Sequence, residues 1–166
     1  QPSNIKDFNL YCYRVAGVVG IMMSKIFRTQ DNQIALNAAD KLGCAMQITN
    51  ILRDVKEDFA NERIYIPKSL LQKYRIIHSN DFFSIDSDNE SKMNVIKELA
   101  NLGILYYCES LVGIKYIPSF RARMCVKLMI AVYGSILGKI MIDKSIIFKK
   151  RIMTIACMCN NRGLHD

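Results

Sequence analysis

Residues 47–67, QITNILRDVKEDFANERIYIP, combine helical periodicity with a run of oxygen-bearing side chains. At about 100° per residue, Asn50, Asp54 and Asp58 fall at about 0°, 40° and 80° around a helix, and Gln47 falls at about 60°. The apolar side chains occupy the adjacent stripe, between about 100° and 180°: Cys44, Ile48, Ile51, Val55 and Phe59. The pattern predicts a partly buried helix whose polar stripe borders its packed face.

Carboxylates beside an apolar face favour a compensating cation. A carboxylate at the edge of a core loses hydration, and this costs free energy unless a positive charge offsets it. Magnesium fits because it takes oxygen ligands and is commonly shared between one or two carboxylates and a substrate phosphate. The spacing alone leaves a second interpretation open, since acids four residues apart are common on solvated helices. There, Arg53 and Lys56 would neutralise them.

Three stretches together resemble one known family. NILRDVKEDFANERIYIP, residues 50–67, closely resembles the second aspartate-rich motif of the squalene/phytoene synthases, and YCYRVAGVVGIMM, residues 11–23, resembles their other hallmark. RARMCVKLMIAVYGSIL, residues 121–137, resembles the C-terminal helix of the bacterial presqualene diphosphate synthase branch. The resemblance covers essentially the whole chain. It implies an all-α isoprenoid synthase fold, a helical bundle around a deep apolar cavity.

The resemblance also implies a reaction. Family members join two prenyl diphosphates head to head, and we expect two farnesyl diphosphates to give presqualene diphosphate or squalene, on a hopanoid or squalene route. Magnesium is the implied cofactor, and NADPH would be needed only if the reaction continues to squalene. Two alternatives stay open. One is a phytoene synthase that uses geranylgeranyl diphosphate, and the other is an inactive truncated remnant or a non-catalytic prenyl-diphosphate-binding subunit.

The acidic helix supplies most of the implied site residues. Asn50, Asp54 and Asp58 match the metal-binding positions of the family motif, and the two aspartates are implied to be catalytic. Gln47 and Arg53 match positions that contact the diphosphate or its metals. An ion pair between Arg53 and Asp54 or Glu57 is the alternative for Arg53. The residue Arg63 is expected near a phosphate, or paired with Glu62 or Asp58.

The remaining implied site residues belong to the cavity. Tyr11 and Tyr133 match family tyrosines near the substrate, and aromatic faces stabilise the carbocation that forms when diphosphate leaves. Ordinary core packing is the alternative for both tyrosines. Val15 and Gly20 lie on the helix expected to line the cavity. Gly17 and Gly20 are expected to leave room for the prenyl chain and to let that helix bend. Four methionines are expected to line a flexible pocket or to fill the core: Met22, Met23, Met124 and Met129.

The coarse organisation is helical throughout, since the 3.6-residue period dominates and strand alternation is scarce. Residues 78–92 are polar and rich in turn formers, which predicts a loop. Ser119 is expected to cap the helix that follows Pro118. The expected helices cover residues 5–27, 31–59, 68–74, 92–116, 119–142 and 144–159. We interpret residues 1–166 as a single, N-terminally incomplete squalene/phytoene synthase domain.

One element of the family pattern has no match. The first aspartate-rich motif of the family lies upstream of YCYRVAG, where residues 1–10 contain only Asp7 and no second acid four residues on. The chain therefore looks like the C-terminal part of a family member. Because two facing acidic clusters are needed around two diphosphates, we expect residues 1–166 alone to lack synthase activity.

The net charge and the cysteine content limit the class of partner and the cellular compartment expected for the chain. The net charge of +8 suggests an anionic partner, but no nucleic-acid-binding motif is present and the basic residues look scattered, apart from Lys149–Arg151. Six cysteines without a CxxC pair fit free, buried thiols in a reducing compartment. No signal peptide is recognised, and the longest uninterrupted apolar run, residues 128–138, is too short to cross a bilayer. We expect a cytoplasmic protein with no nucleic-acid partner and with peripheral membrane association as an option; the oligomeric state stays open.

Overall fold

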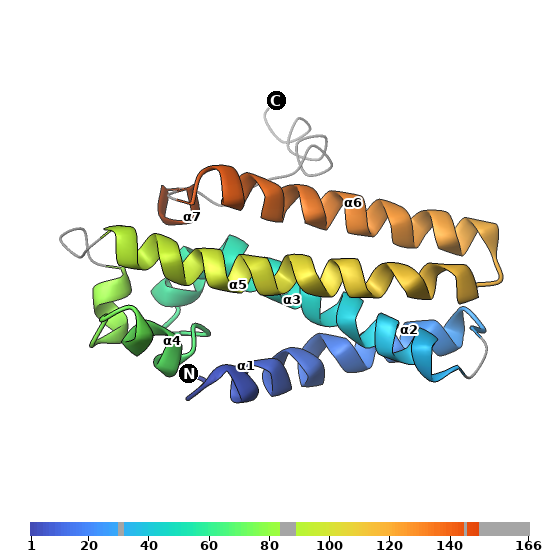
Figure 1. Ribbon diagram of the computed structural model, residues 1–166, viewed down its shortest axis with the longest axis horizontal. Helices are drawn as coiled ribbons and strands as arrows, with labels where there is room; N and C mark the ends of the chain where they lie inside the picture. Colours follow the sequence, from blue (N-terminus) through green and yellow to red (C-terminus); the bar gives the residue numbers. More distant parts are fainter. Residues whose placement is uncertain (30–31, 84–88, 145, 150–166) are drawn as a thin grey trace, which may run out of the picture.

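Helices form the whole regular structure of the described part of the chain (Figure 1). The computed structural model describes residues 1–29, 32–83, 89–144 and 146–149. No strand occurs within these ranges. The all-α prediction is therefore confirmed.

The first arm of the bundle is a continuous helical rod that changes its winding once. Helix α1 (Ile5–Cys12) passes into a π-helical turn, η1 (Tyr13–Gly17), and then into α2 (Val18–Ile26). The helix expected here, with a bend near Gly17 and Gly20, is present as these three consecutive segments, and the change of winding ends at Gly17. π-Helical turns inside α-helices are often found at functional sites.

The long helix α3 (Gln33–Ala60) runs back along this rod and forms the centre of the bundle. The remaining elements are α4 (Lys68–Lys73), the 3₁₀ turn η2 (Ser79–Phe82), α5 (Asn89–Ser110), the 3₁₀ turn η3 (Leu111–Tyr116), α6 (Phe120–Ile142) and α7 (Ile146–Lys149). Helices α5 and α6 lie side by side across α3 (Figure 1).

Side-chain caps define where two of these helices begin. Asn32 Oδ1 accepts the backbone N–H of Ile34 at 2.8 Å, which starts α3. Ser119 Oγ accepts the backbone N–H of Ala122 at 3.3 Å, which starts α6 and confirms the predicted cap. Both interactions satisfy N–H groups that the helix itself leaves without partners.

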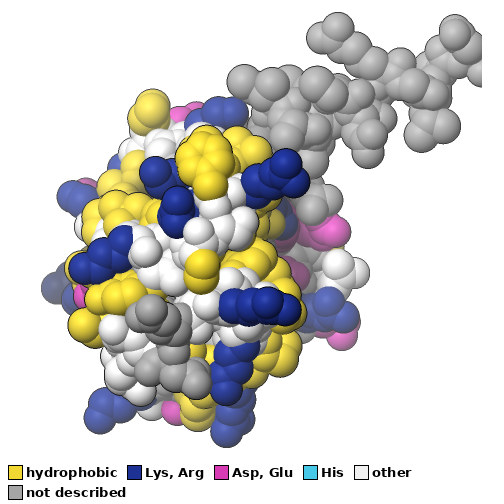
Figure 2. All heavy atoms as spheres, turned by 90° about the vertical axis from the view of Figure 1, so that its right-hand side faces the viewer, with side chains coloured by type: hydrophobic (Ala, Val, Ile, Leu, Met, Phe, Trp, Pro, Cys, Tyr) yellow, Lys and Arg dark blue, Asp and Glu magenta, His cyan; other side chains and the backbone are white. Residues whose placement is uncertain are grey.

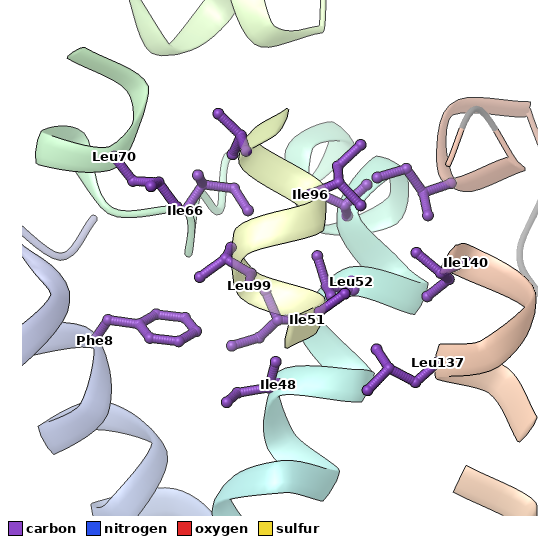
Figure 3. Packing of buried hydrophobic residues seen from close by; sticks show 14 of the residues in the cluster. Phe8, Ile48, Ile51, Leu52, Ile66, Leu70, Ile96, Leu99, Leu137 and Ile140 are labelled. Atoms are coloured by element: carbon purple, nitrogen blue, oxygen red, sulfur yellow. The ribbon is translucent and has the colours of Figure 1, made fainter. Parts of the chain in front are cut away.

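The hydrophobic core is built around α3. Its Ile48, Ile51 and Leu52 meet residues of the neighbouring helices (Figure 3). These neighbours are Phe8 of α1, Ile96 and Leu99 of α5, and Leu137 and Ile140 of α6, and all are at most 1% exposed. Because three helices hold α3 on its apolar side, the polar stripe is fixed in position at the edge of the core.

Two local expectations were wrong. Residues 78–92 were expected to be a loop, but they include η2, and Phe82 is 1% exposed. A phenylalanine in a polar segment can still fill space in the core, and the turn formers around Phe82 obscured this.

The expectation of buried cysteines was only partly right. Cys12 and Cys44 are buried as expected, whereas Cys108 and Cys125 are exposed. Most of the expected last helix, together with Cys157 and Cys159, lies outside the described residues.

Helix α6 also differs from the sequence-based view of membrane-spanning potential. It has 23 residues and contains a window with a mean hydropathy of 1.7, so by length and composition it is able to cross a bilayer. The uninterrupted apolar run underestimated the length of the apolar helix, because isolated basic residues do not end the helix. Only 22% of this window is buried, and core helices of water-soluble proteins pass the same test.

Candidate functional site

The predicted polar stripe lies on one face of a single unbroken helix. Gln47, Asn50, Asp54 and Asp58 all fall within α3, and all four side chains are partly buried. Ile48, Ile51 and Val55 on the adjacent stripe are buried. The prediction that the oxygen donors border the packed face is therefore confirmed.

Asn50 carries a buried oxygen that the described part of the chain does not satisfy. Its Oδ1 atom is inaccessible to solvent and has no hydrogen-bond partner among the described residues, a property shared with Asn9 Oδ1 on α1. Leaving a buried acceptor unpaired costs about 1–3 kcal/mol. A buried, unpaired oxygen one turn before Asp54 therefore suits a ligand that brings its own positive charge.

Arg53 and Asp54 form an ion pair at the surface of the same helix. Arg53 Nε donates to Asp54 Oδ1 at 2.8 Å, and Arg53 Nη2 donates to Asp54 Oδ2. The hydrogen bond to Asp54 raises the pKa of Arg53, and the nearby Tyr133 adds to that shift. The alternative in which Arg53 pairs with Asp54 is thus what the structure shows, and Tyr133 is brought to the same cation.

Asp58 lies in a second polar group, with Arg63 and Tyr11. Burial and then the charge of Asp54 raise the pKa of Asp58, while the positive charge of Arg63 opposes that shift. Arg63 is exposed, and its backbone N–H donates to the Asp58 carbonyl oxygen at 2.8 Å. This backbone bond does not test the expected side-chain pairing of Arg63 with Asp58, which stays a prediction.

Tyr11 reaches this group from α1. Its ring stacks on Tyr65 with centroids 5.0 Å apart, and burial, a hydrogen bond to Tyr65 and the nearby Asp58 raise the pKa of Tyr11 to about 12. The phenol therefore stays protonated at neutral pH. Tyr65 belongs to the segment after the acidic helix and was not among the predicted site residues. Its place next to that motif in the sequence is the signal that could have identified it.

An apolar cleft of about 340 Å³ begins at the Asn50 end of the stripe. Four predicted site residues line it: Val15, Gly20, Gln47 and Asn50. Arg53, Asp54, Asp58, Arg63, Tyr11 and Tyr133 are not part of its wall. Polar groups and apolar volume are therefore separated along α3, and Gln47 and Asn50 lie at the junction.

The predicted reason for Gly20 was wrong. A Cβ at Gly20 would overlap the carbonyl oxygen of Ala39, and one at Gly17 would overlap the Asp40 carboxylate. The missing side chains therefore make room for α3 and not for a prenyl chain, although the backbone of Gly20 does line the cleft. Glycines in a helix are expected both where two helices approach closely and where small residues line a cavity, so the sequence alone does not distinguish the two.

The far wall of the cleft was largely missed by sequence reasoning. It is formed by η3 and α6, through Gly113, Ile114, Val126 and Met129. All four methionines considered are exposed, and of these Met23 and Met129 line the cleft, whereas Met22 and Met124 do not. No sequence signal identifies η3 as cavity wall, because its role depends on how α5 and α6 cross α3.

Among the described residues, no group of three or more His, Cys, Asp or Glu side chains is arranged to hold a metal ion. Asp54 and Asp58 supply two carboxylates, and Asn50, which is not one of these four residue types, adds an amide oxygen. This donor set matches the ligand chemistry of magnesium, which is usually completed by waters and substrate phosphates.

Comparisons with known proteins agree with this arrangement. The model of the squalene/phytoene synthase family matches residues 1–152. The 15-cis-phytoene synthase of Pantoea ananas is 34% identical over 118 residues, which cover 71% of this chain and 37% of that protein. The 4,4'-diapophytoene synthase of Staphylococcus haemolyticus is 32% identical over 130 residues, which cover 78% and 45%.

Two solved structures are similar in fold. Squalene synthase HpnC from Alicyclobacillus acidocaldarius gives a TM-score of 0.75 at 22% identity, covering 84% of this chain and 51% of that one. A dehydrosqualene synthase in complex with ligand gives 0.64 at 28% identity, covering 81% and 49%. The chain thus spans about half or less of the length of these four proteins. The match of the family model over nearly the whole chain, together with the acidic helix and the cleft beside it, shows that the chain belongs to the squalene/phytoene synthase family.

Proposed function

We propose that the polar stripe of α3 and the adjoining cleft bind a prenyl diphosphate, as part of a synthase that condenses two such molecules head to head. The observation that carries this proposal is the buried Asn50 Oδ1, unpaired within the described residues, where the apolar cleft meets the stripe of Asp54 and Asp58. An amphiphile with an anionic head and an apolar tail matches that division.

Magnesium fits the head-group end of this site. Asn50, Asp54 and Asp58 would hold it, and when bound it supplies positive charge to the departing diphosphate. The raised pKa of Asp58 supports this assignment, because burial and the neighbouring Asp54 disfavour a second negative charge there until a cation arrives.

The other residues of the stripe act on the same head group in this proposal. Gln47 lies at the mouth of the cleft, where its side-chain amide can donate to a phosphate oxygen. Arg53 and Arg63 place positive charge on either side of the two aspartates. Guanidinium groups suit phosphate because they donate several hydrogen bonds in one plane.

The cleft protects the reacting tail. Its wall includes Val15, Ala38 and Leu42, whose hydrocarbon side chains carry no group able to trap a carbocation. Tyr11 and Tyr133 lie outside this wall and near the acidic end of α3. We assign them to the reacting end of the prenyl chain. There, the face of a neutral phenol ring stabilises positive charge without forming a covalent bond to the carbocation.

The chain length of the substrate is a separate part of the proposal. We favour two farnesyl diphosphates, with presqualene diphosphate or squalene as product and NADPH used only in the second case. This rests on the likeness of residues 121–137 to the presqualene diphosphate synthase branch. The names of the sequence relatives, phytoene and diapophytoene synthase, support the alternative of a phytoene synthase that uses geranylgeranyl diphosphate.

A binding measurement tests the site. We expect farnesyl S-thiolodiphosphate to bind the chain in isothermal titration calorimetry with Mg²⁺ and much more weakly with EDTA. Loss of an outer-shell partner already weakens metal binding by about 10–100-fold, so Asp54→Asn and Asp58→Asn should each cause at least that loss. Glu109→Gln, an exposed acid on α5, is the matched control. Binding that is equal in all variants would contradict the proposal.

A turnover measurement separates synthase from binding subunit. Residues 1–166 supply one acidic pair four residues apart on a helix, Asp54 and Asp58, so we predict that chain 1–166 with farnesyl diphosphate and Mg²⁺ forms no presqualene diphosphate. Activity that appears only after addition of a polypeptide with a second DxxxD helix would favour the non-catalytic binding subunit. Product formed by the chain alone would show that the prediction of an incomplete site is wrong.

The cellular setting also remains a proposal. The four cysteines in the described part of the chain are free, which supports a reducing compartment such as the cytoplasm. We do not assign a nucleic-acid partner, because no nucleic-acid-binding motif is recognised in the sequence.

A further inference from the structure

Helix α3 forms the floor of the apolar cleft, which we define as the α3 residues that line it. These residues recur at intervals of three or four positions from Ala35 to Asn50, so they lie on one face of the helix. At a rise of about 1.5 Å per residue, the two ends of the floor lie about 22 Å apart along the helix axis. The cleft therefore follows α3 over about four turns, away from the acidic end of the stripe.

The side chains of the floor become smaller with distance from the acidic stripe. Met46 and Leu42 lie nearer to Asn50, and Ala39 and Ala35 lie farther away. Around the helix axis these four residues fall within about 60° of one another, so they face the same part of the cleft. The floor thus changes from large to small side chains between Leu42 and Ala39.

The distal end of the cleft is enclosed by described residues. Phe27 at the end of α2 and Ile117 after η3 contribute to the wall, and Ala35 is 3% exposed. Gly113 of η3 lies against α3, since a Cβ at Gly113 would come within 2.6 Å of the Ala38 Cβ. The turn between α2 and α3 lies at the right-hand end in Figure 1, and Figure 2 views that end, where hydrophobic side chains lie between basic ones.

The two prenyl tails considered above would end at different levels of this floor. An extended chain advances about 1.2 Å per bond, so the main chain of a farnesyl group spans about 13 Å and that of a geranylgeranyl group about 18 Å. If the first carbon lies level with Asn50, these lengths correspond to about 9 and 12 residues of helix. A farnesyl tail then ends near Leu42, whereas a geranylgeranyl tail continues past Ala39 to the level of Ala38.

We propose that Ala39 and Ala35 determine the length of the prenyl tail that the cleft accepts, because they leave room for the carbons beyond the fifteenth. Met46 and Leu42 line the part of the cleft that both tails occupy, so they do not distinguish them. Adding methylene groups to a filled apolar site forces neighbouring groups to move. A larger side chain at either alanine therefore excludes the longer tail. This inference rests on the proposed function and identifies the part of that site that discriminates between the tails.

Binding of two substrate analogues to chain 1–166 with Mg²⁺ tests the proposal. Isothermal titration calorimetry gives a dissociation constant for farnesyl S-thiolodiphosphate and one for geranylgeranyl S-thiolodiphosphate. A buried methylene group strengthens binding about fourfold, so the unmodified chain should bind the longer tail more than about tenfold more tightly. Ala39→Leu and Ala35→Leu should each weaken binding of the longer tail about tenfold or more and leave the shorter tail within about threefold.

Two further variants are matched controls. Ala131→Leu makes the same substitution at an exposed position of α6 that does not line the cleft, and it should change neither affinity. Leu42→Phe adds a larger side chain beside the part of the cleft that both tails occupy, so it should weaken both analogues to a similar extent.

The proposal is overturned if the unmodified chain binds the longer tail no more tightly than the shorter one, a result that requires no variant to fold. It is also overturned if Ala39→Leu and Ala35→Leu weaken both analogues equally, or if Ala131→Leu has the same effect as these two variants. Loss of binding for both analogues in the unmodified chain would overturn the proposed function as well. Binding of both analogues with a ratio that no variant changes would overturn this inference alone.

Discussion

Asp58 lies one helical turn after Asp54 on α3, and its own burial together with the charge of Asp54 raises the pKa of Asp58. Two carboxylates held this way disfavour simultaneous ionisation. Arg53 and Arg63 offset part of the repulsion, but Arg53 is already engaged by Asp54. The fold therefore keeps a negative pair in a position where a divalent cation would relieve its free-energy cost.

The pair gives a prediction for stability against pH. A raised carboxyl pKa means that the folded state favours the protonated form. Its stabilising contribution is full below the ordinary carboxyl pKa of about 4 and is lost as the pH rises through the raised pKa of Asp58. We therefore expect Asp58→Asn to increase the free energy of unfolding at pH 7 with EDTA present. Urea denaturation should show that difference shrink toward zero below about pH 4. A variant that is less stable than wild type at pH 7 would contradict the assigned shift.

Helix packing gives a second prediction. A Cβ on Gly20 would overlap the Ala39 carbonyl, and one on Gly43 would overlap the Ala16 carbonyl. Backbone atoms cannot move aside cheaply, so Gly20→Ala and Gly43→Ala should each lower the free energy of unfolding by about 1–3 kcal/mol. A Cβ on Gly134 in α6 would meet nothing within 4 Å. Gly134→Ala is the control and should stabilise by about 0.5–1 kcal/mol in urea denaturation. Equal effects at all three positions would be inconsistent with the close approach of α2 and α3.

A buried hydroxyl pair gives a third prediction. Thr49 Oγ1 and the Tyr107 hydroxyl lie 2.9 Å apart, and both side chains are buried between α3 and α5. We expect Tyr107→Phe and Thr49→Val each to destabilise the chain, with a coupling free energy of about 1 kcal/mol in the double-mutant cycle. Chemical denaturation of the four proteins measures this value. A coupling near zero would mean that the two hydroxyls do not bond in solution.

Cysteine reactivity gives a fourth prediction. Burial raises the pKa of Cys12 to about 12, and burial and the Asp40 charge raise the pKa of Cys44. Thiols react as thiolates, so these two should resist iodoacetamide near pH 8. Cys108 and Cys125 are exposed and should be alkylated in the native protein. Peptide mass spectrometry with and without urea tests the difference, and rapid native labelling of Cys12 would contradict the placement of α1 on α3.

The acidic helix was the part of the molecule most accessible from sequence. Its stripe of Asn50, Asp54 and Asp58 follows from helix geometry alone, because neighbours along one helix are fixed by their spacing. Gly17 of η1 and Gly20 of α2 were recognised but misinterpreted, because the sequence does not say which neighbour fills the space. The cleft wall from η3 depends on contacts between distant segments, which periodicity does not report.

Placement of a divalent cation on the α3 stripe is the central claim, and paramagnetic NMR tests it most directly. With farnesyl S-thiolodiphosphate bound, Mn²⁺ added in place of Mg²⁺ should broaden the side-chain amide signals of Asn50 and Gln47 beyond detection. The exposed Gln33 at the N-terminal end of α3, about 30 Å from Asp54 along the helix, should stay sharp, and Asp54→Asn should abolish the broadening. Sharp Asn50 signals at saturating Mn²⁺ and ligand, or broadening centred elsewhere, would contradict the account.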